Sequence, residues 1–249
     1  DGTFKRAGVD LGPLDLRRQV SRKIKKKDKN HYKQRKDRKY LNGRLYKDYQ
    51  AYIDEHPDAK VVQMDTVYNN ISEGPFMQTF KFMRYSFTII IYHDTKDARS
   101  MLEGILLLEK ILGAQMFDTE AEVLLTDRGA EFTLADEIER RDDGTMRTRI
   151  FYCDPMQSAQ KGSLENNHEE IRYICPKETD LHRLGLNSQE DANLITSPIN
   201  SFPKERLNGK TPFEMVKFPT PEMAERFIQF GIVEIEKDKV VLKPYLLKK

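Results

Sequence analysis

The chain has 249 residues, of which 38% are hydrophobic, 10% aromatic and 33% charged. This length accommodates one large domain or one domain with appendages, and the aromatic content excludes a wholly disordered chain. No apolar run approaches the roughly 20 residues of a membrane-spanning helix, and the first residues lack the apolar core of a signal peptide. The chain begins with Asp1 instead of Met, so we expect residue 1 to be a cut point in a longer protein.

Charge is distributed unevenly along the chain, although the net charge is only +2. Between Arg17 and Lys47 there are 15 Lys and Arg residues and two acids, which leaves 27 bases against 38 acids elsewhere. This basic arm includes Lys25, Lys26, Lys27, Arg35 and Lys36. Such a segment either binds nucleic acid through its phosphates without reading sequence, or is a solvated, partly disordered linker that binds nothing specifically. The composition leaves both interpretations open.

Strands are predicted over residues 60–67, 76–82 and 86–92, because these runs are rich in β-branched and aromatic side chains. Over 98–112 the apolar residues recur at helical spacing, and Gly113 ends the helix. A fourth strand is predicted over 121–126. A helical stretch around 133–141 then leads to a fifth short strand over 149–153.

The second half of the chain is predicted to be mainly helical. A helix over 161–174 is ended by Pro176. Two capping boxes, at 188–191 and 211–214, indicate the starts of further helices. The alternation over 231–242 predicts a β-hairpin. Together with the strands, this order of elements indicates a mixed α/β fold.

The two cysteines, Cys153 and Cys175, form neither a CxxC pair nor a disulfide framework. We predict two small, buried side chains, since free cysteine is usually buried. Nothing in the composition indicates export, so we expect an intracellular protein.

Three carboxylates stand where a metal site can form. Asp65 lies near the end of the first strand, Asp127 directly follows the fourth, and Glu165 lies on the helix after the fifth. If the first and fourth strands are neighbours, the two Asp side chains meet at one edge of the sheet, and a helix packed there brings Glu165 to them. Converging carboxylates repel one another unless hard cations neutralise them, and Mg²⁺ prefers oxygen ligands. With 40 acids in the chain, this pattern alone does not single out these three.

Local motifs add a resemblance to a known family. The stretch 124–132, LLTDRGAEF, resembles the second-aspartate motif TDxGxEF of DDE transposases and retroviral-type integrases. Residues 150–167, IFYCDPMQSAQKGSLENN, resemble the third-acid motif of one branch, the IS-thirty insertion-sequence transposases. Residues 171–180, IRYICPKETD, and 200–212, NSFPKERLNGKTP, are similar to the stretches that follow in that branch. The resemblance covers about 60–217 and keeps the motif order.

The resemblance implies an RNase H-like fold, in which helices flank a mixed five-stranded sheet. We expect a basic arm or linker over residues 1–50, the integrase-type catalytic domain over 51–218, and a small C-terminal helix-hairpin tail over 219–249.

The resemblance also implies a catalytic triad of Asp65, Asp127 and Glu165 that binds two Mg²⁺ (or Mn²⁺) ions. The implied chemistry is DNA strand cleavage followed by strand transfer, both by in-line phosphoryl transfer. The expected partners are transposon ends and target DNA, with the chain acting as a homo-oligomer on DNA and without a membrane. The expected location is the bacterial cytoplasm or nucleoid.

Residues beside the motifs are further candidates. Lys161, at the start of the catalytic helix, and Arg128, beside Asp127, are predicted to contact DNA phosphates, because the helix dipole does not favour a cation at position 161. Spacing alone would allow Glu169 as the third ligand instead of Glu165.

Three other polar residues in or near the motifs are given supporting roles. Glu131 is interpreted as a group close to the metal ligands. Asp154 is interpreted as a turn or cap residue. His168, three residues after Glu165, could reach the site, but we favour an exposed helical side chain.

The chain also departs from the family pattern. Phe82-Met83 stands where an acid followed by a base is usual, Gln63 stands where Glu is common, and the chain contains no Trp. The helix-turn-helix region that recognises transposon ends is not visible. These departures keep open an alternative, a catalytically inactive, transposase-derived DNA-binding protein. A third interpretation keeps the fold and the metals but makes the chain a nuclease on RNA–DNA hybrids.

Overall fold

The computed structural model describes residues 38–155, 157, 160 and 162–247, with the side chains of 162–167 left out of the description. The predicted DNA contacts Lys25, Lys26, Lys27, Arg35, Lys36 and Lys161 lie outside the described residues. So does the greater part of the predicted basic arm.

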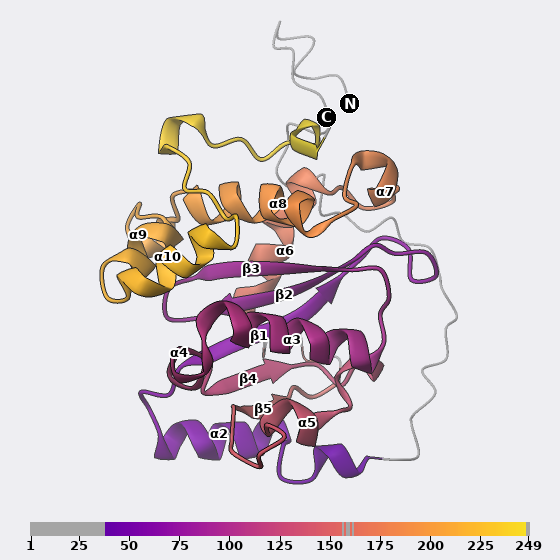
Figure 1. Ribbon diagram of the computed structural model, residues 1–249, viewed down its shortest axis with the longest axis vertical. Helices are drawn as coiled ribbons and strands as arrows, with labels where there is room; N and C mark the ends of the chain where they lie inside the picture. The colour runs from indigo at the N-terminus through magenta and orange to yellow at the C-terminus, as the bar shows by residue number, and fades with distance from the viewer. Residues whose placement is uncertain (1–37, 156, 158–159, 161, 248–249) are drawn as a thin grey trace, which may run out of the picture.

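A mixed five-stranded sheet forms the centre of the molecule (Figure 1). Its strands are β1 (Val61–Val67), β2 (Phe76–Phe82), β3 (Phe87–His93), β4 (Val123–Thr126) and β5 (Arg149–Tyr152). They lie in the order β3-β2-β1-β4-β5. The pairs β1–β2 and β2–β3 are antiparallel, and the pairs β1–β4 and β4–β5 are parallel. The predicted α/β fold, with helices flanking a mixed five-stranded sheet, is confirmed.

One face of the sheet is covered by helices from the middle of the chain. These are α3 (Ala98–Leu112), α4 (Ala114–Glu120) and α5 (Ala135–Glu139). Asp97 caps α3 by accepting backbone N–H groups, and the apolar side of this helix packs against strand residues such as Met64 and Phe80. Gly113 joins α3 to α4 with φ of +74°, a conformation that side chains disfavour, so the predicted helix stop is confirmed.

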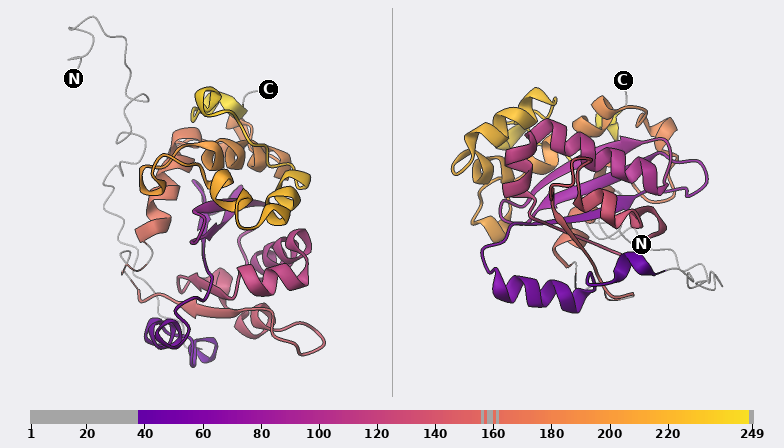
Figure 2. Two further views of the ribbon diagram at one scale, coloured as in Figure 1. Left: turned by 90° about the vertical axis from the view of Figure 1, so that its left-hand side faces the viewer. Right: turned by 60° about the horizontal axis from the view of Figure 1, so that its bottom comes forward.

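The opposite face is divided between two groups of helices. Over β1 to β3 lie α6 (Gly162–Ile174), α7 (Leu181–Leu184) and α8 (Gln189–Ser201), which share a core with Val67 and Met77. Over β4 and β5 lies α2 (Tyr46–Glu55) (Figure 2). The tyrosines of α2 pack against Phe151. The short 3-10 helix η2 (Lys39–Leu41) precedes α2, so the chain is folded against the sheet from residue 38 onward. Two further 3-10 turns in the described part of the chain are η3 (Ala130–Phe132) and η5 (Glu205–Leu207).

The C-terminal part contains helices but not the predicted hairpin. Helices α9 (Pro212–Lys217) and α10 (Pro221–Gln229) are followed by the 3-10 turns η6 (Lys237–Lys239) and η7 (Pro244–Leu247). The β-hairpin prediction over 231–242 is wrong, because the backbone polar groups there bond elsewhere. The N–H groups of Val233 and Ile235 donate to Ser197 Oγ and Ser201 Oγ of α8, each at 2.9 Å. This segment therefore lies along the surface of α8 and does not pair with a strand.

Smaller predictions from the sequence are also borne out. Thr211 and Glu214 form the reciprocal capping box that opens α9, with Pro212 at its first position. Ser188 caps α8 by accepting the N–H of Asp191. Both cysteines are buried and unpaired by disulfides, as predicted.

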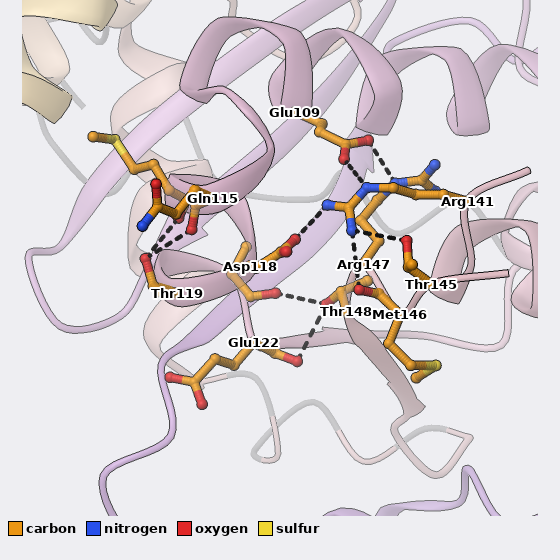
Figure 3. A network of polar contacts seen from close by, with 12 residues as sticks. Glu109, Gln115, Asp118, Thr119, Glu122, Arg141, Thr145, Met146, Arg147 and Thr148 are labelled. Carbon is orange, nitrogen blue, oxygen red and sulfur yellow. Dashed lines mark hydrogen bonds and ion pairs between the residues drawn. The ribbon is translucent and has the colours of Figure 1, made fainter. Parts of the chain in front are cut away.

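A polar network fixes the segment that leads into β5 (Figure 3). Glu109 of α3 accepts hydrogen bonds from Arg141 Nε and Arg147 Nε, both at 2.6 Å, and Arg141 also pairs with Asp118 of α4. Arg147 is only 6% exposed, so its charge is neutralised inside the protein. The carboxylate of one helix therefore holds both ends of the 141–147 loop.

No helix among the residues that the structure describes combines the length and the apolar character needed to cross a membrane.

Candidate functional site

The pairing of β1 with β4 brings two of the predicted acids together. These strands run parallel, with Val61 opposite Val123 and Gln63 opposite Leu125. Continuing this register by two residues sets Asp65 opposite Asp127. Alternate residues of a strand face the same side, so both acids share the face of Val67, which packs against the α6–α8 group. Asp65 is half-buried and Asp127 is exposed, and together they form the centre of the candidate site.

Each of these carboxylates is oriented by a backbone N–H close to it in sequence. Oδ1 of Asp65 accepts from the N–H of Thr66 at 2.8 Å. Oδ1 of Asp127 accepts from the N–H of Gly129 at 2.9 Å, which closes the turn after β4. Carboxylate oxygens held at one sheet edge are suitable ligands for a hard divalent cation.

The helix that carries the third predicted acid is fastened to the end of β1. Arg172, near the end of α6, donates to Asn69 Oδ1 and to the carbonyl of Tyr68, the latter at 3.2 Å. Asn69 in turn donates to the carbonyls of Pro176 and Thr179 at 2.8 and 2.7 Å. Burial lowers the pKa of Arg172, so these acceptors compensate a charge that has lost much of its water. The network couples the position of α6 to the strand that carries Asp65.

Glu165 lies in the N-terminal half of α6, but its side chain is outside the described part of the chain. The neighbouring acids have other environments: Glu169 is exposed, and Glu170 forms an ion pair with Lys204. Among the described side chains, no set of three His, Cys, Asp or Glu residues could hold a metal ion. The assignment of the third ligand to Glu165 therefore stays a prediction.

A lysine that the sequence did not single out lies beside Asp127. Lys96, in the loop between β3 and α3, forms a 2.7 Å ion pair with Glu131, and its ammonium lies 4.6 Å from the centre of the Tyr68 ring. Burial lowers the pKa of Lys96, but the hydrogen bond to Glu131 and the charges of Glu131 and Asp127 outweigh this and leave the pKa raised. Lys96 is therefore a permanent cation next to the acid pair.

A buried lysine lies on the face of the sheet that carries Asp65. Lys81 of β2 pairs in register with Gln63 and is completely buried. Burial lowers its pKa to about 6, and the charges of Arg206 and Lys204 act in the same direction while Glu170 opposes them.

The remaining predicted residues are placed as follows. Arg128 donates from Nη2 to Asp154 at 2.6 Å. Asp154 also begins a turn, since its carbonyl accepts the N–H of Gln157 at 3.3 Å. Glu131, interpreted from sequence as a group near the ligands, is buried beside Lys96. His168 is half-buried, so the interpretation as an exposed side chain is wrong.

Lys96 and Arg172 were missed because no local pattern marks them. Lys96 directly precedes Asp97, the N-cap of α3, and Arg172 lies in the last turn of α6. Cations are common on the protein surface at both kinds of position. Only the tertiary packing brings Lys96 near Asp127 and Arg172 to the segment that follows β1.

The curated proteins similar to this chain are insertion-sequence transposases, whereas no family model matches it. The chain is 31% identical over 134 residues to "Transposase InsI for insertion sequence element IS30A" from Escherichia coli, a match that covers 53% of the chain and 31% of that protein. It is 30% identical over 95 residues to the transposase for insertion sequence element IS1086 from Cupriavidus metallidurans, covering 38% of the chain and 26% of that protein. The matches thus span about a third or less of these relatives. The resemblance to IS-thirty and other insertion-sequence transposases, first seen in the motifs, is confirmed.

Similar solved structures are retroviral integrases. The catalytic core domain of BIV integrase has a TM-score of 0.45 and 17% identity, over 62% of this chain and 91% of that one. The simian T-cell lymphotropic virus intasome in complex with PP2A regulatory subunit B56 gamma has a TM-score of 0.48 and 12% identity, over 64% of this chain and 55% of that one.

Proposed function

We propose that this chain is the catalytic domain of a DDE-type transposase, which cleaves DNA strands and joins them to a target by in-line phosphoryl transfer. The observation that carries the proposal is the parallel pairing of β1, which carries Asp65 near its end, with β4, which Asp127 directly follows. The similarity to insertion-sequence transposases supports it, since the matched segment accounts for half of the chain.

The proposed ligands of the metal are Asp65, Asp127 and Glu165, and the proposed cofactor is two Mg²⁺ or Mn²⁺ ions. Carboxylates at adjacent strands suit hard cations, and converging like charges are costly without them. When bound, such ions would lower the pKa of the attacking water or hydroxyl and stabilise charge on the leaving oxygen.

The protein's own groups have positioning and electrostatic roles in this proposal. The N–H of Gly129 holds Asp127 in one orientation, and the Arg172–Asn69 network holds α6 against β1. Lys96 places a positive charge beside the acids, where it attracts the phosphodiester backbone.

The two reactions use the same centre. In the first, water attacks a phosphodiester at the element end, the bond to the 3′ oxygen breaks, and a 3′-hydroxyl is left. In the second, that hydroxyl attacks a phosphodiester of target DNA and displaces its 3′ oxygen. Because the second step joins an element end to a target DNA, we propose a homo-oligomer on paired ends, acting in the bacterial cytoplasm or nucleoid.

The experiment is metal-dependent cleavage and strand transfer on labelled duplex DNA carrying the element's ends. We expect activity with Mg²⁺ or Mn²⁺, and we expect Asp65→Asn, Asp127→Asn and Glu165→Gln each to reduce it at least a hundredfold. Glu169→Gln serves as the matched control on the same helix. Full activity of the Asp127→Asn variant would disprove the proposal. If Glu169→Gln abolished activity while Glu165→Gln retained it, the third metal ligand would be Glu169 instead of Glu165.

The basic arm is proposed to add sequence-independent DNA affinity through Lys25, Lys26, Lys27, Arg35 and Lys36, with Lys161 and Arg128 contacting phosphates near the site. Phosphate contacts of this kind release counterions, so the affinity should fall steeply with salt. Deletion of residues 17–37 should reduce both the affinity and its salt dependence, and an unchanged salt slope would make the arm a linker.

A further inference from the structure

A pocket of about 460 Å³ opens where the chain enters its first helix, beside the turn that follows Asp127. Three separate segments contribute to it: the η2 helix with its following turn, the first turn of α2, and the turn after β4. The lining residues are Arg38, Leu41, Asn42, Gly43, Leu45, Lys47, Asp48 and Arg128.

The charge of this pocket is predominantly positive. Arg38 and Lys47 are exposed, and Arg128 is partly buried, with 18% of its side chain accessible. Asp48 is the single acid among the lining residues, and its Oδ2 is already occupied by the N–H of Leu45 at 2.8 Å. Three cations around one cavity repel one another, so the pocket favours an anion.

Arg128 has hydrogen-bonding capacity that the described residues do not use. One of its terminal nitrogens donates to Asp154, but its Nε is buried and has no hydrogen-bond partner among the described residues. A buried donor without an acceptor is costly. A ligand in the pocket can contact the accessible part of the Arg128 side chain, which is 18% of it. The planar guanidinium is well suited to phosphate, because it offers parallel N–H groups.

The corner that presents Arg38 and Lys47 is fixed to the body of the protein. Arg44 pairs with Asp136 and Glu139, both at 2.6 Å, and its carbonyl accepts the N–H of Tyr152 at 2.8 Å. Leu45 forms a parallel bridge with Tyr152, at the edge of β5. Since this corner is held by the sheet, the cations are arranged before any ligand binds, which lowers the entropic cost of binding.

We propose that this pocket binds a backbone phosphate of DNA and thereby anchors the duplex next to the Asp65–Asp127 pair. This inference rests on the proposed function, because the pocket would bind a second part of the same DNA substrate. Arg128 directly follows Asp127 in the chain, so the pocket is lined by the residue next to a proposed metal ligand. Arg38 and Lys47, which also line it, belong to the basic stretch 17–47.

The test measures DNA binding without catalysis, by fluorescence anisotropy of a labelled 30-base-pair duplex in EDTA. The full chain is compared with an Arg38→Ala/Lys47→Ala double variant and with Arg128→Gln. The matched control is Arg84→Ala/Lys110→Ala, which removes the same charge from exposed positions outside the pocket. Because Arg38 and Lys47 are exposed, the double variant should keep its melting temperature.

We expect the pocket double variant to bind about tenfold more weakly at 0.1 M salt and its salt slope to fall by about 1 to 2, whereas the control changes little. Arg128→Gln should weaken binding in the same direction. Equal affinity and slope in the pocket and control variants would overturn the proposal.

Failure of this inference and failure of the proposed function are distinguishable. If Asp127→Asn abolishes cleavage while the pocket variants bind DNA like the control, only the pocket assignment is wrong. If the pocket variants lose affinity while Asp127→Asn still cleaves, the pocket stands and the catalytic assignment is wrong.

Discussion

The backbone of Gly129 and the side chain of Asp127 form a contact that leaves no room for a larger residue. The Gly129 N–H donates to Oδ1 of Asp127 at 2.9 Å. A Cβ added at Gly129 would lie 2.9 Å from that same oxygen and 2.6 Å from Oε2 of Glu131. Gly129 has φ of −60°, which any residue adopts, so the constraint is the space beside two carboxylates and not backbone strain.

We therefore predict that Gly129→Ala displaces the Asp127 carboxylate and reduces DNA cleavage by about a hundredfold, the cost of an ångström-scale misplacement of a reacting group. The measurement is single-turnover cleavage at saturating DNA. Ala130→Ser, an exposed change in the same turn, is the control and should retain activity. Wild-type cleavage in the Gly129→Ala variant would show that Asp127 tolerates the shift or has no part in the reaction.

The ion pair between Lys96 and Glu131 predicts a charge effect on catalysis. Removing the ammonium in Lys96→Met leaves a buried carboxylate beside Asp127, so we expect the catalytic rate to fall about tenfold, less than the loss of a donor that touches the reacting oxygen. Lys96→Arg keeps the charge and should retain most of the rate. The measurement is kcat and KM with and without the substitution.

The double variant Lys96→Met/Glu131→Gln separates two explanations of that loss. It removes both charges of the pair, so recovery of kcat would assign the effect to the unpaired Glu131 carboxylate. Continued loss would assign it to the missing positive charge. A Lys96→Met variant with wild-type kcat would contradict the role of this lysine altogether.

Buried Lys81 predicts a pH dependence of stability. Its pKa is about 6 in the folded protein, compared with an ordinary value of 10.5. Between these values the unfolded chain binds a proton that the folded chain lacks, so the free energy of unfolding contributed by this group rises with pH. Lys81→Met should therefore be more stable than the wild type at pH 7, by about 1–4 kcal/mol.

The stability advantage of Lys81→Met should shrink as the pH approaches 10.5, where lysine is neutral in both states. Urea unfolding at pH 7, 8.5 and 10 measures this trend. Lys81 faces Lys204, Arg206 and Glu170, so Lys110→Met, on an exposed helix surface, is the control that should show no such trend. A pH-independent difference for Lys81→Met would mean that the lysine is charged in the folded protein.

The network of Figure 3 predicts a large loss of stability when its acceptor is removed. Glu109→Gln takes one negative charge from two guanidinium groups, of which Arg147 is almost fully buried. Breaking such a buried pair from one side costs about 3 kcal/mol, because a charge is left without its partner. Thermal unfolding measures the effect, and Glu103→Gln, at an exposed position of the same helix, is the matched control. A shift no larger than that of the control would show that Asp118 alone sustains the network.

Much of the fold could be predicted because the relevant signals are local. The β-branched runs of the strands, the apolar spacing of α3 and the capping box at Thr211 each specify their element through neighbouring residues. The hairpin prediction failed because alternation describes side chains only. The backbone N–H groups of Val233 and Ile235 found acceptors in Ser197 and Ser201, which lie more than thirty residues earlier in the chain.

For the candidate site, local sequence was sufficient to place Asp65 near the end of one strand and Asp127 directly after another. It could not predict that these strands are parallel neighbours, that Lys96 pairs with Glu131, or that Arg38, Lys47 and Arg128 line one pocket. Strand pairing and ion pairing depend on distances in space, and the packing of the whole core sets those distances. No short stretch of sequence records them.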